Sequence, residues 1–223
     1  MRTRQEIKML AKEAVARQWG TSALIFLLFT LIEVACSSFP LIGLAGGLVY
    51  LVLKVGVNGA FISIFCGEKV SVGDPFSCLS VNFWRKLGGM LWVSLWTFIW
   101  FLPLFVLAAI ALVWVGQWMF LCSLLLIVPA VIAAISYSMT PFILADCPDV
   151  KATKAIKLSV RMTYGHKGEL FVLVLSFIGW YLLSALTLNI LFIVYVGPYT
   201  TATYAGFYME LRDLALRSGV IGP

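Results

Sequence analysis

Two ionisable side chains, Glu33 and Lys54, interrupt an otherwise apolar run over residues 20–67. An ionised group in lipid hydrocarbon costs at least a few kcal/mol, so such a residue usually has a partner or a function. Asn58 follows Lys54 by one helical turn and favours a polar helix face. Three interpretations stay open: an ion pair that fixes packing, a site for a solute or proton, and a lysine that reaches water.

A second polar cluster surrounds Pro198 in residues 195–204, where Tyr199 and Thr203 lie one turn apart. Hydroxyl groups can bond to carbonyls freed by the proline or to a neighbouring helix, and this packing role is favoured over a substrate site. The candidate intramembrane polar site is therefore Glu33, Lys54, Asn58, Tyr199 and Thr203.

The residue inventory argues against enzyme chemistry. The chain has a single histidine, His166, and lacks an H-E-x-x-H motif, a G-x-S-x-G motif and a phosphate-binding loop. A catalytic site needs a nucleophile or a paired acid and base within reach, and the sequence offers neither. We expect no catalytic residue, no metal site and no cofactor.

Long gaps between charged residues indicate the elements that position the polar side chains. Residues 87–145 and 170–209 contain no charged residue or histidine. A bilayer core about 30 Å thick needs roughly 20 apolar residues per helix, so each gap fits two crossings. The sequence predicts six transmembrane helices in three hairpins, over residues 19–39, 42–66, 88–114, 117–140, 169–187 and 189–209.

The basic residues predict the orientation of these hairpins. Of 16 Lys and Arg residues, all but Lys54 lie in four segments, 2–17, 69–86, 151–167 and 212–217, whereas the alternate turns 37–42, 115–118 and 186–189 carry no charge. By the positive-inside rule, both termini and the long loops are cytoplasmic. We expect a multi-pass bacterial plasma membrane protein whose basic face meets anionic lipid head groups rather than nucleic acid.

A short amphipathic helix is predicted before each hairpin. The first begins at a Thr3-x-x-Glu6 capping box, the second at Asp74-Pro75, and the third near Pro148. Their basic faces form a candidate lipid or partner surface. This surface comprises Lys8, Lys12, Arg85, Lys86, Lys154, Lys157 and Arg161.

Trp92, Trp96 and Trp100 recur every fourth residue and so share one face of the predicted third span. A stripe that faces lipid or packs on a helix is favoured, with an aromatic groove for an amphiphile as the alternative. The sequence predicts a single membrane domain over residues 1–223, with a possible threefold repeat over residues 1–67, 74–142 and 148–211.

Several motifs together resemble an uncharacterised family of bacterial integral membrane proteins. They are the segment 137–144, Asp146-x-Pro148, the segment 155–159, Gly165-x-Lys167, the segment 175–180, Pro198-Tyr199 and Ala205-x-Phe207-Tyr208-x-Glu210-Leu211. The chain is similar to domain-of-unknown-function family 975, which is typical of Firmicutes. This resemblance implies a bacterial plasma membrane protein and supplies no reaction, substrate or functional residue.

The expected fold is therefore an all-α polytopic membrane bundle. The favoured function is a non-catalytic, membrane-organising role that engages lipid, a protein partner or a second copy of the chain. The alternative is a transporter or permease for a small or amphiphilic solute, which rests on Glu33, Lys54, Asn58 and the sixth span.

Overall fold

The structure is a computed structural model that describes residues 2–38, 40–113 and 126–219, and these residues form helices and turns without a strand. The prediction of an all-α fold is confirmed. The helices are α1 (Arg4–Arg17), α2 (Trp19–Ser38), α3 (Pro40–Phe65), the 3-10 helix η1 (Asp74–Leu79), α4 (Phe83–Val113), α6 (Ile127–Tyr137), α7 (Thr140–Asp146), α8 (Ala152–Met162), α9 (Lys167–Leu175), α10 (Ile178–Leu186), the π-helix η2 (Phe192–Val196) and α11 (Gly197–Arg217).

Five segments of the described chain are long and apolar enough to cross a membrane. They are Trp19–Cys36, Gly46–Phe65, Phe83–Leu107, Ile127–Asp146 and Lys167–Leu186. The predicted turn at 115–118 and the adjoining ends of two predicted spans lie outside the described residues. Five of the six predicted spans thus have a counterpart among these candidates.

The predicted sixth span, 189–209, is not among the candidate spans found in the described residues. Leu188 and Asn189 have φ values of 51° and 64°, so the chain turns there, and η2 then interrupts the regular helix before Pro198. The helix that follows, α11, carries several hydroxyl side chains and then the charged residues Glu210, Arg212, Asp213 and Arg217. It is therefore too polar to qualify by composition.

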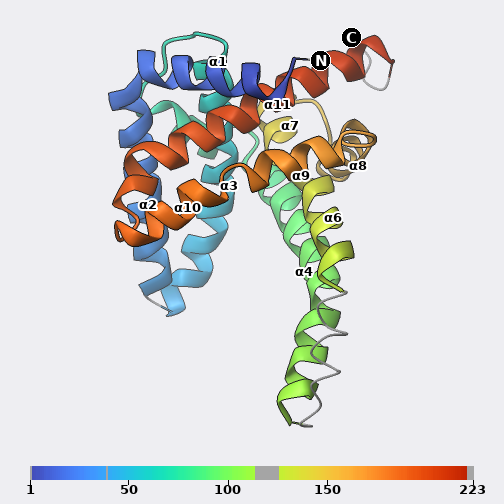
Figure 1. The fold of residues 1–223 in the computed structure, drawn as a ribbon. Helices are drawn as coiled ribbons and strands as arrows, with labels where there is room; N and C mark the ends of the chain where they lie inside the picture. Colours follow the sequence, from blue (N-terminus) through green and yellow to red (C-terminus); the bar gives the residue numbers. More distant parts are fainter. Residues whose placement is uncertain (1, 39, 114–125, 220–223) are drawn as a thin grey trace.

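The helices form two pairs that run away from α1, and a third layer, made of α9, α10 and α11, that crosses them (Figure 1). Figure 1 shows α2 and α3 on one side and α4 and α6 on the other, with the two pairs diverging toward the end away from α1. The segment α9–α10 crosses between the pairs, and α11 returns diagonally to lie beside α1 (Figure 1). The helix α11 also contacts α2, α3 and α8.

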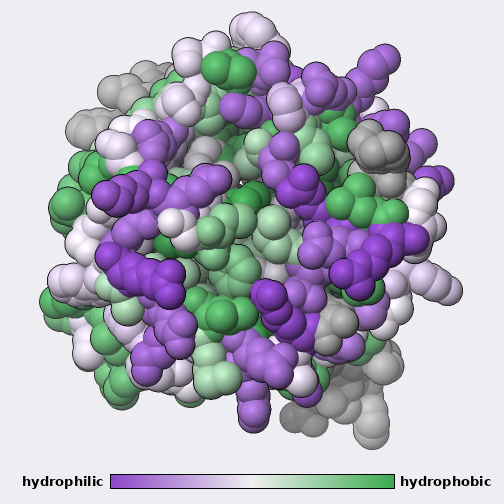
Figure 2. Space-filling view, turned by 90° about the horizontal axis from the view of Figure 1, so that it is seen from above, coloured by the Kyte–Doolittle hydropathy of each residue, from purple (hydrophilic) through white to green (hydrophobic). Residues whose placement is uncertain are grey.

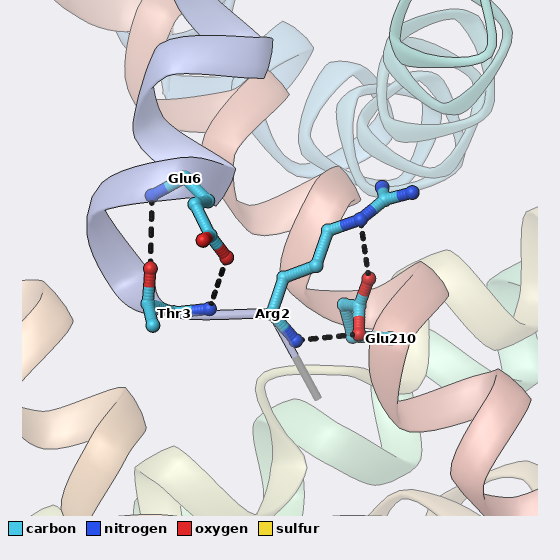
Figure 3. A network of polar contacts seen from close by, with 4 residues as sticks. All are labelled: Arg2, Thr3, Glu6 and Glu210. Carbon is cyan, nitrogen blue, oxygen red and sulfur yellow. Dashed lines mark hydrogen bonds and ion pairs between the residues drawn. The ribbon is translucent and has the colours of Figure 1, made fainter.

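The first helix, α1, is fixed to the protein at its start and along its apolar side. Thr3 Oγ1 accepts a hydrogen bond from the Glu6 amide at 3.3 Å, and Glu6 Oε2 accepts one from the Thr3 amide at 2.8 Å (Figure 3). This is the predicted capping box. Arg2 forms an ion pair with Glu210 of α11 at 3.5 Å. The buried residues Ile7, Ala11, Ala14 and Val15 pack on the other helices.

The prediction of an amphipathic α-helix that begins at Asp74-Pro75 is wrong, because this segment forms a 3-10 helix. Asp74–Leu79 form only the short 3-10 helix η1. Asn82, with φ 54°, then separates η1 from α4, which begins at Phe83. The third predicted helix corresponds to α8, whose buried residues include Ile156, Leu158 and Met162. Most of the apolar side of α1 and of α8 is covered by protein, and Leu10 of α1 is exposed.

The exteriors of α2 and α4 are apolar. Exposed side chains on α2 include Leu24, Leu27 and Leu31, and those on α4 include Leu95, Phe98 and Phe105. In an 18-residue stretch of the Phe83–Leu107 segment only 6% of the residues are buried inside the protein. An apolar surface of this extent suits lipid rather than water.

Close approach of η1 to α3 depends on Gly56, because a Cβ atom there would overlap the carbonyl oxygen of Pro75 and the Sγ atom of Cys78. We predict that Gly56→Ala lowers the stability of the protein by about 1–3 kcal/mol through overpacking. The measurement is the thermal unfolding midpoint in detergent. The matched control is Gly88→Ala in α4, where a Cβ meets nothing within 4 Å, and which should be neutral or stabilising. Equal midpoints for the two variants would contradict this account of the packing.

Candidate functional site

A cavity of about 430 Å³ lies where the third layer meets the two helix pairs. Its lining draws on seven α-helices and on η2, so it is a feature of the assembled fold and not of one hairpin. The residues with polar side chains around it are Lys54 and Asn58 of α3, Thr97 of α4, Tyr137 and Ser138 at the end of α6, Tyr181 of α10, and Thr200, Thr201 and Tyr204 of α11. Apolar residues such as Phe26 and Met90 complete the wall.

Lys54 gives the cavity its charge. It lies near the middle of the candidate span Gly46–Phe65, and none of the ion pairs in the described part of the chain involves it. Asn58, one turn further along α3, is only 7% exposed, yet no hydrogen bond between described residues uses its side-chain amide. An ammonium and an amide that have no partner among the described residues therefore line the same cavity.

Several hydroxyl groups line the same cavity as this cation. Thr200, Thr201 and Tyr204 lie on one side of α11, and the hydroxyl group of Tyr181 lies near Thr200. Thr200 Oγ1 also donates to the carbonyl oxygen of Gly197 at 3.0 Å. Hydroxyl and amide groups can donate hydrogen bonds, so with the ammonium they form a site suited to an anionic group.

Three of the five predicted polar-site residues do not line this cavity. Glu33 lies near the Tyr50 hydroxyl and forms no ion pair with Lys54, both residues being described. Tyr199 packs edge-on against Phe177 at 5.3 Å between ring centroids. Thr203 Oγ1 donates to the carbonyl oxygen of Tyr199 at 2.8 Å. Residues 199 and 203 share a different side of α11 from residues 200, 201 and 204.

Some residues of the predicted basic surface form hydrogen bonds within the protein, and the others are exposed. Arg85 donates to the carbonyl oxygens of Leu144, Cys147 and Val150 at 2.7, 3.1 and 2.7 Å. Lys86 is buried and donates to the carbonyl oxygen of Cys78 at 3.2 Å. These two residues therefore fix loops and do not belong to an outward surface.

Lys8 is also engaged within the protein. Its Nζ atom donates to Ser176 Oγ and lies 4.3 Å from the centroid of the Phe177 ring. Burial, with a smaller contribution from Arg4, lowers the pKa of the Lys8 ammonium below its usual range. The remaining predicted residues, Lys12, Lys154, Lys157 and Arg161, are exposed.

A polar cluster at Asp146 joins α7 to α11 and was not predicted. The Tyr208 hydroxyl donates to Asp146 Oδ2 at 2.7 Å, and Arg212 Nε lies 3.2 Å from the same carboxylate. Asp146 and Tyr208 both occur in the motifs that carry the family resemblance, and pairing those motifs could have suggested the contact. This cluster fixes two of the helices that line the cavity.

The comparison with known families agrees with the resemblance seen in the sequence. A family described as "Protein of unknown function (DUF975)" matches residues 1–215. The chain belongs to this family. No curated protein and no solved structure matches it. As a member of this family the chain inherits no assigned reaction or ligand, so its function has to be argued from the cavity and the surface.

We predict that Tyr208→Phe lowers the free energy of unfolding by about 1.5–3 kcal/mol, because it removes a hydrogen bond to a carboxylate. Chemical denaturation in detergent, followed by tryptophan fluorescence, measures the change. Tyr164→Phe is the matched control, since the Tyr164 side chain is 80% exposed and should be insensitive to loss of its hydroxyl. A Tyr208 variant as stable as this control would show that the Asp146 cluster does not hold α7 to α11.

Proposed function

We propose that this chain is a non-catalytic, multi-pass protein of the bacterial plasma membrane. It binds an anionic amphiphile in the cavity beside Lys54, and this binding is a step in the transport of the amphiphile. The observation that carries the proposal is a cation in the middle of an apolar helix, facing a cavity, with no acidic partner in the described residues. Such a residue is costly unless a ligand or water compensates its charge.

The membrane location is supported by the distribution of polarity. The sides of α2 and α4 are apolar, whereas the end that carries α1 and α8 shows many hydrophilic side chains around and between hydrophobic patches (Figure 2). This end includes the exposed basic residues Lys12, Lys154 and Lys157. By the positive-inside rule it is the cytoplasmic end.

The choice of ligand follows from the cavity's groups. Among the described residues that line it there is one cation, and no Asp, Glu, His or Cys. The lining offers donors for an anionic head and apolar walls such as Phe26, Met90 and Val93 for a hydrocarbon tail. The same lining lacks a paired acid and base, which supports binding rather than catalysis.

A membrane-organising role is the second candidate, and the basic side of α8 favours it. Lys154, Lys157 and Arg161 are exposed and take part in no ion pair or hydrogen bond between described residues. Anionic lipid or an acidic partner could be held there. This surface is smaller than the sequence predicted, because Lys8, Arg85 and Lys86 form hydrogen bonds within the protein.

The proposed topology predicts opposite labelling of two engineered cysteines in a cysteine-free background. Ser38 lies at the end of α2 away from α1, and Lys154 lies on α8. An impermeant maleimide added to intact cells should label Ser38→Cys, and should label Lys154→Cys only after the membrane is permeabilised. Labelling of both cysteines under the same condition would contradict the orientation.

The cavity proposal predicts that Lys54→Met weakens binding of a fatty-acid anion. The probe is cis-parinarate, and energy transfer from tryptophan to this fluorescent acid reports its occupancy. Loss of one charged interaction should weaken binding roughly ten- to hundredfold. The variant should unfold at the same or a higher temperature than the wild type, because it removes an uncompensated cation from an apolar helix.

Glu33→Gln is the matched control, since Glu33 is ionisable and lies in the neighbouring helix but does not line the cavity. It should bind the probe as the wild type does. Unchanged binding by Lys54→Met would overturn the cavity site, and a large loss of stability in that variant would assign Lys54 a structural role instead.

A further inference from the structure

A second hollow, a groove of about 700 Å³, lies on the outside of the protein between α4 and α8. Trp92 and Trp96 of α4 form one wall, and Lys157 and Arg161 of α8 form another. Tyr137, at the end of α6, also borders it. The groove therefore joins an aromatic surface to a cationic one. Its position is separate from Lys54, which does not line it.

The cationic wall lacks a counterion in the described part of the chain. Lys157 and Arg161 are four residues apart on α8, so they lie on one side of the helix, and both are exposed. The helix contains no acidic residue, and neither side chain enters an ion pair or hydrogen bond between described residues. Two like charges at this spacing repel each other, and an anion between them would relieve that repulsion.

The aromatic wall suits a hydrocarbon chain. Trp92 and Trp96 are 39% and 42% exposed, and their ring centroids are 6.4 Å apart. Successive turns of α4 separate them by about 6 Å along the helix axis, so they extend the wall along the direction of a lipid chain. Ile156 and Val160 of α8 add apolar surface beneath the cations.

We propose that this groove binds one glycerophospholipid with a net negative head group, its phosphate between Lys157 and Arg161 and an acyl chain along Trp92 and Trp96. The argument is charge complementarity combined with an apolar wall on the same hollow. The proposal rests on the membrane location proposed above and does not depend on the Lys54 cavity. A head group without a tail would use only the cations, and a neutral lipid would use only the tryptophans.

The experiment reconstitutes the full chain in phosphatidylcholine vesicles and measures quenching of tryptophan fluorescence by brominated acyl chains. Brominated phosphatidylglycerol is compared with brominated phosphatidylcholine at the same mole fraction. The wild type should be quenched more strongly by the anionic lipid. This excess should disappear in Trp92→Phe/Trp96→Phe, because the reporting side chains are then gone.

Charge variants of α8 separate a groove from a diffuse basic surface. Lys157→Gln and Arg161→Gln should each weaken the apparent affinity for phosphatidylglycerol about fivefold, and the double variant roughly 25-fold. Lys154→Gln is the matched control, because Lys154 is an exposed cation of the same helix that does not line the groove. It should leave the excess quenching unchanged. Equal losses from Lys154→Gln and Lys157→Gln would overturn the proposal.

The remaining outcomes are also decisive. Quenching of the wild type by neither brominated lipid would refute the membrane location and the groove with it, whereas equal quenching by both would refute the groove alone. Relief of the excess by soluble glycerol phosphate would show a site for the head group only and would overturn the lipid assignment. Co-purification of an acidic protein, abolished in the double charge variant, would assign the groove to a protein instead.

Discussion

The uncompensated ammonium of Lys54 is the constraint on which the cavity depends. A cation in the middle of α3 cannot be covered by apolar side chains without a large loss of solvation energy, so the fold must leave polar space beside it. The oblique path of α11 provides this space. At Gly206 this helix packs directly against Phe65 of α3, where a Cβ atom would overlap the ring. Thr200 lies about 9 Å earlier along α11, where it borders the cavity instead.

The basic residues that the sequence assigned to the surface fall into two groups: those that form hydrogen bonds within the protein and those that are exposed to solvent. Arg85 satisfies three carbonyl groups at the end of α7 and in the loop that follows, which lack partners within a helix. Its charge is thus used for structure. The cations Lys154, Lys157 and Arg161 of α8 make no hydrogen bond to a carbonyl group of the described residues and remain exposed. Together with other exposed cations such as Lys12, they contribute a positive field at the cytoplasmic end of the proposed topology.

The sequence predicted the elements better than it predicted the site. The capping box fixed the start of α1, and the charge gaps located five apolar helices, since both signals are local. The sixth span is not confirmed for a reason that is also local, because a π-helix before Pro198 divides a segment that composition alone makes continuous. Lys54 and Asn58 were found because an ionisable or amide group in an apolar helix is conspicuous.

The hydroxyl groups of the cavity could not be selected in this way. In apolar helices most hydroxyls bond to the preceding turn of their own helix, as Ser136 does to the carbonyl oxygen of Ile132 and Ser184 to that of Trp180. Which of them faces a cavity depends on helices far away in the sequence. Tyr137 illustrates the point, because it borders both the Lys54 cavity and the α8 groove. Under the two proposals, a lipid in the groove lies one side chain from the cavity, and both places select an anion. Tyr137 is thus the wall shared by two proposed sites for the same class of ligand, an anionic amphiphile.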